Sequence, residues 1–462
     1  MPERMIVLGG DAAGMSAASQ ARRRRPADDL QIVAFERSSY VSYSACGEAY
    51  YVGGYFDDLD RLVVVTPGEF AARDIEVHVR HDVEEIDTEG GKVTVRNLED
   101  GGQASHGYDT LVYATGATPI RPPIEGLELE GVYEMQTLDD AGVVRALVDQ
   151  GVERAVIVGG GYIGLEMAEA FHHQRIPTAV VTSGPAVLET TLDPDMGELV
   201  NERMQEMGIA VHTGTEVECL NGVHGRVRSV DCGRLELPAE VVMLGLGTRP
   251  VTELAEQAGI PLGESGAVWV NPRQQTRVEG VWAAGDCAEA VHRVSQGPVN
   301  YHLGTIANKQ GRVAGINIGG GYATFPGVVG TSITKVCDLE IARTGLTSEE
   351  AQRAGFEFVT ATVDSTTTAG YWPEAEELRL KVLAERVTGR LLGAQIVGGS
   401  GAAKRIDVFA TALWNEMTAA EMVNLDLAYA PPFASVWDPI LIGARKAWEA
   451  VGSTEPEQPL PS

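Results

Sequence analysis

The 462-residue chain is short of cysteine, of basic charge and of long apolar runs. Its five cysteines are scattered and odd in number, which excludes a disulfide framework and fits a reducing cytoplasm. The chain carries 36 Lys and Arg against 65 Asp and Glu, and this net charge of −29 argues against nucleic acid or an anionic membrane as a partner. We find no run of 18 apolar residues and no basic-then-apolar leader, so we expect neither a membrane span nor secretion.

What the chain does have is the length and composition of a multidomain globular protein. A single hydrophobic core stops growing at about 250 to 300 residues, so this length predicts two or three domains. Apolar residues make up 44% and charged residues 22%, as in ordinary soluble proteins. The 54 glycines fit several turns of the kind that bind nucleotides.

A complete dinucleotide-binding unit lies inside the chain. A strand at 155–158 leads through Gly159, Gly161 and Gly164 into a helix, and a second strand follows at 178–182. In such units the glycines let the turn approach a pyrophosphate, whose charge the N-terminus of the helix faces. The position between a strand and a helix is what makes the glycine pattern informative.

A less complete unit of the same kind begins the chain. A strand at 5–8 precedes Gly9 and Gly14, a helix runs through Arg25, and a strand follows at 31–36. Asp11 occupies the middle glycine position, so this unit alone is only suggestive.

The two units differ at the ends of their second strands. Glu36 ends the first, where a carboxylate can accept hydrogen bonds from a ribose diol; the alternative is an exposed strand-end carboxylate. Residues 182–185 end the second and offer neither the acid that favours NADH nor the arginine that favours NADPH. The sequence therefore leaves the nicotinamide preference open.

Further strand–glycine segments at 111–119, 242–250 and 281–286 close the two units and return the chain to the first. From about residue 326 the periodicity is that of an α+β module. The predicted fold class is α/β, with two Rossmann-like dinucleotide-binding domains and a C-terminal α+β domain. The predicted boundaries are 1–118 and 250–325 for the first domain, 119–249 for the second, 326–451 for the third and 452–462 for a disordered tail.

Cys46 stands in the segment 42–51, shortly after the first unit, with no second cysteine nearby. A thiol that reacts beside a redox cofactor without a resolving cysteine must cycle through a sulfenic acid or a mixed disulfide with a small thiol. The alternative is a small buried hydrophobe. We expect that second role for the remaining cysteines, Cys219, Cys232, Cys287 and Cys337.

These features resemble the pyridine nucleotide–disulfide oxidoreductases over nearly the whole chain. The resemblance rests on both nucleotide units, the linker Ala114-Thr115-Gly116 and the return at Gly285-Asp286. The Ser-aromatic-x-x-Cys-Gly frame around Cys46 is similar to the single-cysteine branch, which includes NADH oxidase, NADH peroxidase and coenzyme A-disulfide reductase. The resemblance implies FAD in the first unit, NADH or NADPH in the second, a C-terminal dimerisation domain that forms a homodimer, and no metal.

Within that branch, two features favour coenzyme A-disulfide reductase. The oxidases and peroxidases carry a histidine at the position of Ala12, as the acid–base partner of the sulfenic acid. Residues 369–373 and 428–433 resemble the two tyrosine motifs of coenzyme A-disulfide reductases. That resemblance implies that Tyr371 and Tyr429 reach across the dimer to the cysteine of the partner subunit; their alternative role is aromatic packing at an interface.

The resemblance also assigns binding residues. Those for FAD are Gly9, Ala13, Gly14, Glu36, Arg37, Ser42, Val83, Ala114, Thr115, Gly116, Gly285 and Asp286. Those for NAD(P)H are Gly159, Gly161, Tyr162, Ile163, Gly164, Glu166 and Gly247, where Tyr162 falls at a gate over the nicotinamide pocket and Glu166 beside it. Those for the substrate are Gln20, Arg22, Arg23, Ser42, Lys404 and Arg405. Residues 19–25 match a helix end that helps hold the phosphorylated ADP of coenzyme A, and residues 404–408 also resemble the coenzyme A-disulfide reductases. The alternatives are a solvated helix end for the arginines and ordinary packing for Tyr162 and Glu166.

Departures from the family pattern lie beside Cys46. Tyr43 replaces the usual phenylalanine, and Glu48-Ala49 replaces the usual apolar–proline pair. We expect Glu48 to add negative charge near the thiol and to change which disulfide is accepted. The chain is too short for the rhodanese domain that some relatives carry, so we expect no fused sulfur-transfer domain.

The sequence thus predicts an FAD-dependent enzyme that uses NAD(P)H to reduce a low-molecular-weight disulfide or persulfide, with coenzyme A disulfide as the leading candidate. Two alternatives stay open: an NAD(P)H oxidase that passes electrons to oxygen, and a redox-sensing flavoprotein that acts through a protein partner. Steady-state turnover separates the sensor from the enzymes, and oxygen uptake without added disulfide separates the oxidase from the reductase.

Overall fold

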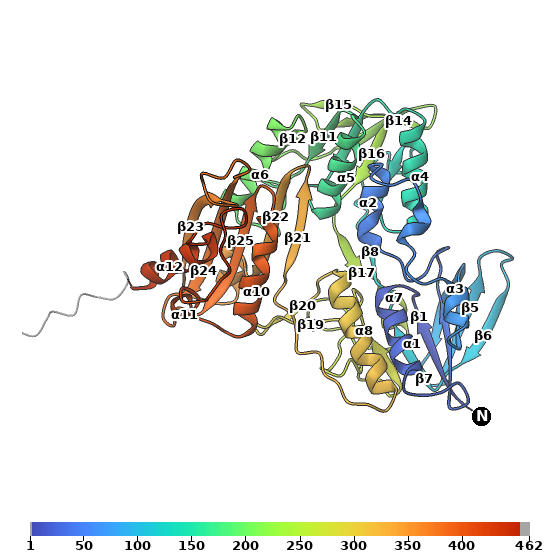
Figure 1. The fold of residues 1–462 in the computed structure, drawn as a ribbon. Coiled ribbons are helices and arrows are strands. Elements are labelled where there is room, and N and C mark those ends of the chain that lie inside the picture. Colours follow the sequence, from blue (N-terminus) through green and yellow to red (C-terminus); the bar gives the residue numbers. More distant parts are fainter. Residues whose placement is uncertain (1, 453–462) are drawn as a thin grey trace, which may run out of the picture.

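The structure is a computed structural model and describes residues 2–452. Three five-stranded sheets dominate this part of the chain, with the first at lower right in Figure 1, the second at the top and the third at the left. The last described helix, α12, covers Pro439–Gly452. Residue 452, the first of the predicted disordered tail, is the last residue of α12, and the rest of that tail, 453–462, lies outside the described residues. Within 2–452, every helix is too short or too polar to cross a membrane.

The first sheet is parallel, with strand order β18-β7-β1-β2-β3. Its central strands are mostly apolar and buried, as parallel sheets require, whereas the edge strand β3 is only partly buried. Helix α1 (Ala12–Arg22) packs beside α8 (Gly304–Ile318) (Figure 1). Helix α1 ends before the predicted Arg25, because a residue that precedes proline, here Pro26, disfavours helical geometry. The strands are β1 (Glu3–Leu8), β2 (Leu30–Phe35), β3 (Ile75–His78), β7 (Thr110–Tyr113) and β18 (Val281–Ala283).

The second sheet is also parallel, with order β12-β11-β10-β16-β9. Its strands are β9 (Val132–Tyr133), β10 (Ala155–Val158), β11 (Thr178–Val181), β12 (Ala210–His212) and β16 (Val241–Leu244). Its helices are α4 (Leu138–Asp149), α5 (Tyr162–His173) and α6 (Pro194–Glu206). Both parallel sheets therefore repeat the strand–helix–strand order that the glycine patterns predict.

Smaller antiparallel sheets flank the two parallel ones. The pair β8 (Ala117–Pro119) and β17 (Thr248–Pro250) links the two units. The others are β4 (His81–Asp87) with β5 (Lys92–Asn97) and β6 (Gln103–Gly107), β13 (Cys219–Val223) with β14 (Arg226–Asp231) and β15 (Glu236–Pro238), and β19 (Ala290–Val291) with β20 (Pro298–Val299). Short helices in these regions are α2 (Glu48–Val52), α3 (Pro67–Ala71) and α7 (Glu253–Gln257).

The third sheet is antiparallel and forms the α+β module, with order β21-β22-β25-β24-β23. Its strands are β21 (Ser332–Val336), β22 (Leu339–Gly345), β23 (Phe358–Thr366), β24 (Glu377–Glu385) and β25 (Leu391–Gly398). Helices α9 (Ser348–Arg353), α10 (Ile406–Trp414), α11 (Ala419–Met422) and α12 accompany it. This is the predicted fold class: two nucleotide-type α/β units and an α+β module.

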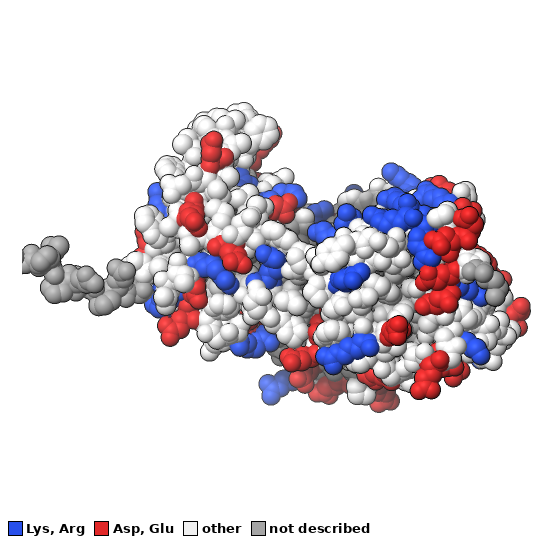
Figure 2. Space-filling view, turned by 90° about the horizontal axis from the view of Figure 1, so that it is seen from below, with Lys and Arg blue, Asp and Glu red and all other residues white. Residues whose placement is uncertain are grey.

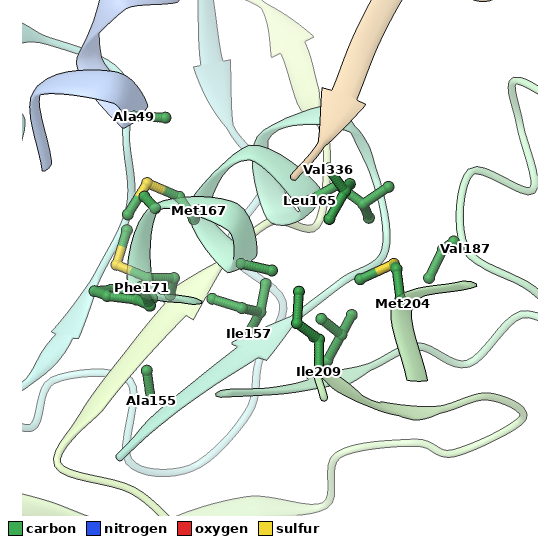
Figure 3. Close-up of a cluster of buried hydrophobic side chains, with 14 of the residues drawn as sticks. Ala49, Ala155, Ile157, Leu165, Met167, Phe171, Val187, Met204, Ile209 and Val336 are labelled. Carbon is green, nitrogen blue, oxygen red and sulfur yellow. The ribbon is translucent and has the colours of Figure 1, made fainter. Parts of the chain in front are cut away.

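One apolar core joins the second and third sheets. Figure 3 shows Leu165, Met167 and Phe171 of α5 packed near Ile157 of β10, with Val336 of β21 at the end of the same helix. All of these side chains are essentially buried. Because burial of a large apolar side chain stabilises the fold by about 1.5–3 kcal/mol, this shared cluster fixes β21 against α5.

Candidate active site

The first nucleotide unit forms a tight turn between β1 and α1. A side chain at Gly9, whose φ is +99°, would lie 2.1 Å from the carbonyl oxygen of Ala114. The turn is held by Glu36, which accepts the N–H of Gly10 at 2.8 Å and that of Ser38 at 2.7 Å. Close approach of two backbones at a helix N-terminus leaves a surface that a pyrophosphate can reach.

The other residues assigned to FAD surround this turn to different degrees. Gly285 lies against Ala13, and the N–H of Ser42 donates to the carbonyl of Gly10 at 2.9 Å. Thr115 instead donates its hydroxyl to the carbonyl of Val251 at 2.8 Å, which ties the loop of Ala114 and Gly116 to the β17 side. Two assigned residues stand farther along the chain from the turn: the exposed Arg37 and the buried Val83 of β4.

Asp286 tests whether these residues fit FAD. Its Oδ1 is buried and has no hydrogen-bond partner within the described protein. Burial, with the nearby carboxylate of Asp11, raises the pKa of Asp286 to about 6. A buried acceptor needs a donor, and the hydroxyl groups of FAD are donors of the right kind. The glycine turn, Glu36 and the unpaired Asp286 therefore fit a hydroxyl-rich dinucleotide.

The second nucleotide unit repeats the same close approach. A side chain at Gly159 would lie 2.2 Å from the carbonyl oxygen of Gly245, and its φ is +109°. Gly161 begins helix α5 as its N-cap, and Gly164 packs onto the carbonyl of Gly159. Ile163 is partly buried on the first turn of α5, whereas Gly247 lies past the end of β16. The N-terminus of α5 is thus presented as in a dinucleotide site.

Cys46 lies in a single 3-10 turn, Ala45–Gly47, directly before α2. It is exposed, which excludes the alternative of a buried hydrophobe. The protein that surrounds the thiol, and the carboxylates of Glu166 and Glu48, raise the pKa of Cys46 above its ordinary value. The protein's own groups therefore oppose thiolate formation instead of favouring it.

The other cysteines differ from one another in burial. Cys287 is fully buried, and burial raises the pKa of its thiol to about 11. Cys219, Cys232 and Cys337 are only partly buried. Cys287 therefore meets the expectation of a small buried hydrophobe in full, and Cys232 and Cys337 meet it in part, because both pack against apolar cores while partly buried.

Glu48 corrects one expectation from the sequence. Its side chain is 4% exposed, and its Oε1 has no hydrogen-bond partner among the described residues. Burial and the carboxylates of Asp140, Asp11 and Glu166 raise the pKa of Glu48 to about 8. At neutral pH the residue is therefore a neutral acid beside Cys46, and the expected negative charge is absent.

A row of polar contacts joins α5 to β21. The hydroxyl of Tyr162 lies 2.5 Å from that of Ser332, and Thr334 donates its hydroxyl to Glu166 at 3.2 Å. One helical turn on, the ammonium of Lys335 lies 2.5 Å from Glu169. Burial raises the pKa of Glu166 to about 7, against the hydrogen bond from Thr334. The structure thus places Tyr162 and Glu166 between the second nucleotide turn and the third sheet.

The three β21 residues in this row were missed from the sequence. Ser332, Thr334 and Lys335 lie far along the chain from α5, and no local motif marks them. The signal that the sequence did contain is the spacing of Tyr162, Glu166 and Glu169, which places three polar side chains on one face of the helix.

The two tyrosine motifs lie together in the third module. Tyr371 is 75% exposed and Tyr429 is 47% exposed. Partial desolvation and the nearby Tyr371 raise the pKa of Tyr429. Arg405 holds both segments, because its guanidinium donates to the carbonyls of Thr367 at 2.5 Å and Phe433 at 3.0 Å.

Most of the residues assigned to substrate binding already make hydrogen bonds or ion pairs with other groups of the protein. Arg22 donates to the main-chain carbonyls of Arg25, Leu30 and Asp74 at 2.8, 2.7 and 2.9 Å. Gln20 accepts from Arg24 at 2.9 Å, Lys404 pairs with Asp407, and Arg405 lies 3.2 Å from Asp438. Arg23 is exposed, as a solvated or ligand-binding arginine would be.

Basic side chains nevertheless gather locally on this acidic protein. In the view from below, Lys and Arg cluster toward the side of the first sheet and are bordered by Asp and Glu (Figure 2). Such a local patch allows an anion to approach a chain whose net charge is −29.

Comparison with known proteins identifies the family. Residues 3–311 match the model of the pyridine nucleotide-disulphide oxidoreductases, and residues 331–439 match that of their dimerisation domain. The chain belongs to this family, as the sequence predicted. Enzymes of the family depend on FAD and a nicotinamide coenzyme, so the protein is an oxidoreductase.

Comparison with individual relatives shows to which branch of the family the chain belongs. The chain is 41% identical over 450 residues to the "NAD(P)H coenzyme A polysulfide/persulfide reductase" of Pyrococcus horikoshii, covering 96% of this chain and 98% of the relative. It is 33% identical to an "NADH oxidase" of Methanocaldococcus jannaschii, covering 96% of this chain and 98% of the relative. The structure of an NAD-dependent persulfide reductase from A. fulgidus superposes with a TM-score of 0.93 at 38% identity, covering 97% of this chain and 84% of that chain. These similarities confirm the predicted single-cysteine branch.

Proposed function

We propose that the protein uses NAD(P)H to reduce a low-molecular-weight disulfide or persulfide, with coenzyme A as the leading thiol carrier. The observation that carries the proposal is the exposed Cys46, which stands beside an FAD-type cradle without a resolving cysteine in its segment. The names of relatives that act on coenzyme A polysulfides, persulfides and disulfides support the choice of substrate. The scattered free cysteines suit a reducing cytoplasm.

The chain's own residues would hold the cofactors at two turns. The Gly9 turn, Glu36 and Asp286 would hold FAD, and the Gly159 turn with the N-terminus of α5 would hold NAD(P)H. Bound FAD supplies a two-electron relay between the hydride of NAD(P)H and a sulfur atom. Tyr162 and Glu166, both fixed by β21, would orient the nicotinamide side of this arrangement.

Cys46 would carry the sulfur chemistry. Its thiolate attacks one sulfur of the substrate, so that the substrate S–S bond breaks, a Cys46–S bond forms, and one thiolate leaves. Two electrons from NAD(P)H then cleave the mixed disulfide, which restores the Cys46 thiolate and frees the second thiol. Each leaving sulfur takes up one proton. Tyr371 and Tyr429 are suited to donate such a proton or hydrogen-bond the leaving sulfur.

We also propose a homodimer in which these tyrosines serve the partner subunit. Their exposure in a module that matches a dimerisation-domain model supports this arrangement. Arg405 would then be a positioning residue, since it binds the carbonyls on either side of the tyrosine segments, and would not contact the phosphates of the substrate.

A second candidate function is oxygen reduction, because the M. jannaschii relative bears the name NADH oxidase. Against it stands Ala12, which replaces the histidine of oxidases and peroxidases. A redox sensor acting through a protein partner would show little steady-state turnover.

The test compares rates with coenzyme A disulfide, coenzyme A persulfide, cystine and oxygen. Cys46→Ser should abolish disulfide and persulfide turnover and leave FAD content and NAD(P)H-driven flavin reduction largely intact. The matched control is Cys219→Ser, which removes a partly buried thiol on β13 of the second unit. Near-normal disulfide turnover by Cys46→Ser, or oxygen uptake that exceeds every disulfide rate, would contradict the proposed function.

A further inference from the structure

The loop that follows β11 folds back onto the glycine turn of the second unit. The N–H of Leu188 donates to the carbonyl of Gly160 at 2.8 Å, and that of Val187 donates to Oδ1 of Asn201 on α6 at 3.0 Å. Leu188 and Val187 are both buried. The next residue, Glu189, is therefore fixed beside the dinucleotide turn although it lies well beyond the strand in sequence.

The carboxyl group of Glu189 lies against Gly184, three residues past the last residue of β11, Val181. A methyl group added to Gly184 would lie 1.8 Å from Oε2 and 2.9 Å from Oε1 of Glu189, so the carboxylate rests over that glycine. Gly184 is buried, whereas Glu189 is exposed and free to meet a ligand. The acid that residues 182–185 do not provide is thus supplied from farther along the chain.

The end of β11 is where a dinucleotide-binding unit contacts the adenosine ribose of its coenzyme. In a dinucleotide-binding unit the adenosine ribose lies over the end of the strand that follows the glycine turn and its helix, here β11. A carboxylate there accepts hydrogen bonds from the free 2′-hydroxyl of NADH. It repels the 2′-phosphate of NADPH, and an anion placed against the wrong ligand is an effective means of discrimination.

We propose that Glu189 makes the enzyme prefer NADH over NADPH. The assignment rests on the proposed use of a nicotinamide coenzyme at the second unit and deepens it by naming the residue that selects the coenzyme. The selecting carboxylate acts at the adenosine end, far along the coenzyme from the nicotinamide, so it changes binding without touching the reacting atoms.

The test measures the dissociation constants of NAD⁺ and NADP⁺ by calorimetry on the FAD-loaded protein, since the oxidised coenzymes bind without reducing it. Wild type, Glu189→Gln and Glu189→Arg are compared with Glu198→Arg, which makes the same charge change at an exposed acid of α6. Hydrogen bonds to a charged group are worth about 10- to 100-fold in affinity, so wild type should favour NAD⁺ by at least about tenfold. Glu189→Gln should lose most of that preference, and Glu189→Arg should shift the ratio by about 100-fold toward NADP⁺.

Three results would overturn the assignment. They are a wild-type preference for NADP⁺, a ratio that moves less than about threefold in Glu189→Arg, and an equal shift in Glu198→Arg. Each of these would leave coenzyme binding itself intact and would reject only the role of Glu189. Failure of the wild type to bind either coenzyme would reject the proposed function together with this assignment.

Discussion

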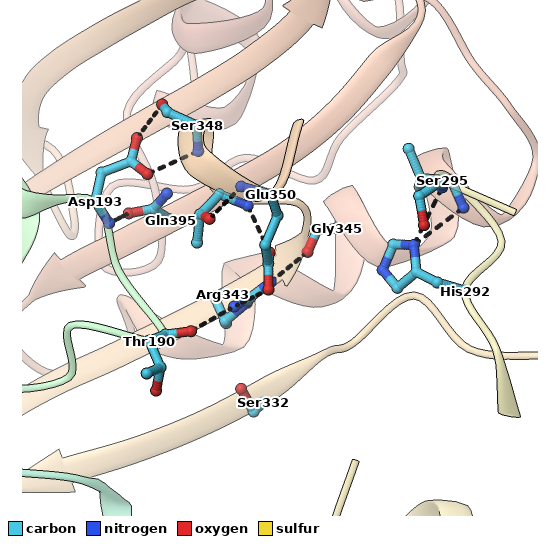
Figure 4. Close-up of polar contacts among 12 residues, drawn as sticks. Thr190, Asp193, His292, Ser295, Ser332, Arg343, Gly345, Ser348, Glu350 and Gln395 are labelled. Carbon is cyan, nitrogen blue, oxygen red and sulfur yellow. Dashed lines mark hydrogen bonds and ion pairs between the residues drawn. The ribbon is translucent and has the colours of Figure 1, made fainter. Parts of the chain in front are cut away.

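Lys381 of β24 lies 2.8 Å from Oδ2 of Asp193, in the loop before α6, and so joins the third sheet to the second. Figure 4 shows that Asp193 also accepts from the amide and the hydroxyl of Ser348. Burial alone would raise the pKa of Asp193, but the hydrogen bonds from Lys381 and Ser348 hold it below its ordinary value. The ion pair therefore holds a charged carboxylate inside the protein and connects β24 to the loop before α6.

Lys381→Met should destabilise the fold strongly, because it leaves the Asp193 carboxylate buried without its countercharge. Removal of one partner of a buried pair costs about 3–5 kcal/mol of unfolding free energy. Urea unfolding followed by tryptophan fluorescence measures this loss. The control is Lys404→Ala, which breaks an exposed ion pair with Asp407 and should cost about 0–1 kcal/mol. If the two variants lost similar amounts of unfolding free energy, the buried Asp193 carboxylate would not need Lys381 for its stabilisation.

Glu48→Gln should make Cys46 more acidic. Glu48 ionises near pH 8, and its carboxylate is one of the charges that raise the pKa of Cys46, so a neutral amide lowers that pKa. The rate of Cys46 alkylation by iodoacetamide, measured against pH on the FAD-loaded enzyme, should rise about three- to tenfold above pH 8. Below pH 7 the rates should be alike, because Glu48 is then neutral in the wild type.

The control for this experiment is Asp139→Asn. Asp139 is an exposed carboxylate next to Asp140, and it is not among the charges that raise the pKa of Cys46, so Asp139→Asn removes the same charge at a site not coupled to the thiol. A titration of Cys46 that is unchanged in Glu48→Gln, or changed equally in Asp139→Asn, would contradict the electrostatic coupling of Glu48 to the thiol.

The same substitution should change how stability depends on pH. The folded-state pKa of Glu48 is about 8, above its ordinary value of 4.5, so the contribution of Glu48 to folding is full below pH 4.5 and is lost as pH rises through 8. Glu48→Gln removes that loss and should be more stable than wild type by about 2 to 4 kcal/mol at pH 8. Thermal unfolding at pH 5 and pH 8 measures the difference, which should nearly vanish at the lower pH. A difference of equal size at both values would refute the raised pKa.

The glycine turns could be predicted because their constraint is local. Gly9 and Gly159 must lack side chains where two backbones meet, and that need appears as a short motif between strand and helix. Cys46 could also be singled out as the candidate redox thiol from its local sequence, since its segment contains no resolving cysteine. Features that depend on residues close together in the sequence could therefore be predicted before the fold was known.

Features that depend on the tertiary fold could not be predicted from the sequence. The carboxylate of Glu189 lies near the end of β11 because the loop before it binds the carbonyl of Gly160. No local sequence pattern predicts that contact. Glu48 suggests a negative charge in the sequence, but burial and the neighbouring carboxylates raise its pKa to about 8, so that the charge is largely lost at neutral pH. Arg22 reads as an anion-binding residue, yet main-chain carbonyls from three segments engage its guanidinium.

Arg405→Lys should slow disulfide reduction without emptying the cofactor site. Lysine keeps the positive charge opposite Asp438, 3.2 Å from the guanidinium, but it cannot hold the carbonyls of Thr367 and Phe433 at once. The segments that carry Tyr371 and Tyr429 should then lose their alignment, with a fall in kcat of about tenfold or more. FAD content and the rate of flavin reduction by NADH should stay within about twofold of wild type.

A double-mutant comparison separates this positioning role from a general loss of fold. Arg405→Lys should cause little further loss when Tyr371 and Tyr429 are already phenylalanine, because the hydroxyl groups that it positions are then gone. If Arg405→Lys slows the double phenylalanine variant as much as it slows the wild type, Arg405 acts independently of the tyrosines. If it lowers the melting temperature enough to empty the flavin site, Arg405 supports the third module as a whole and does not position the tyrosines specifically.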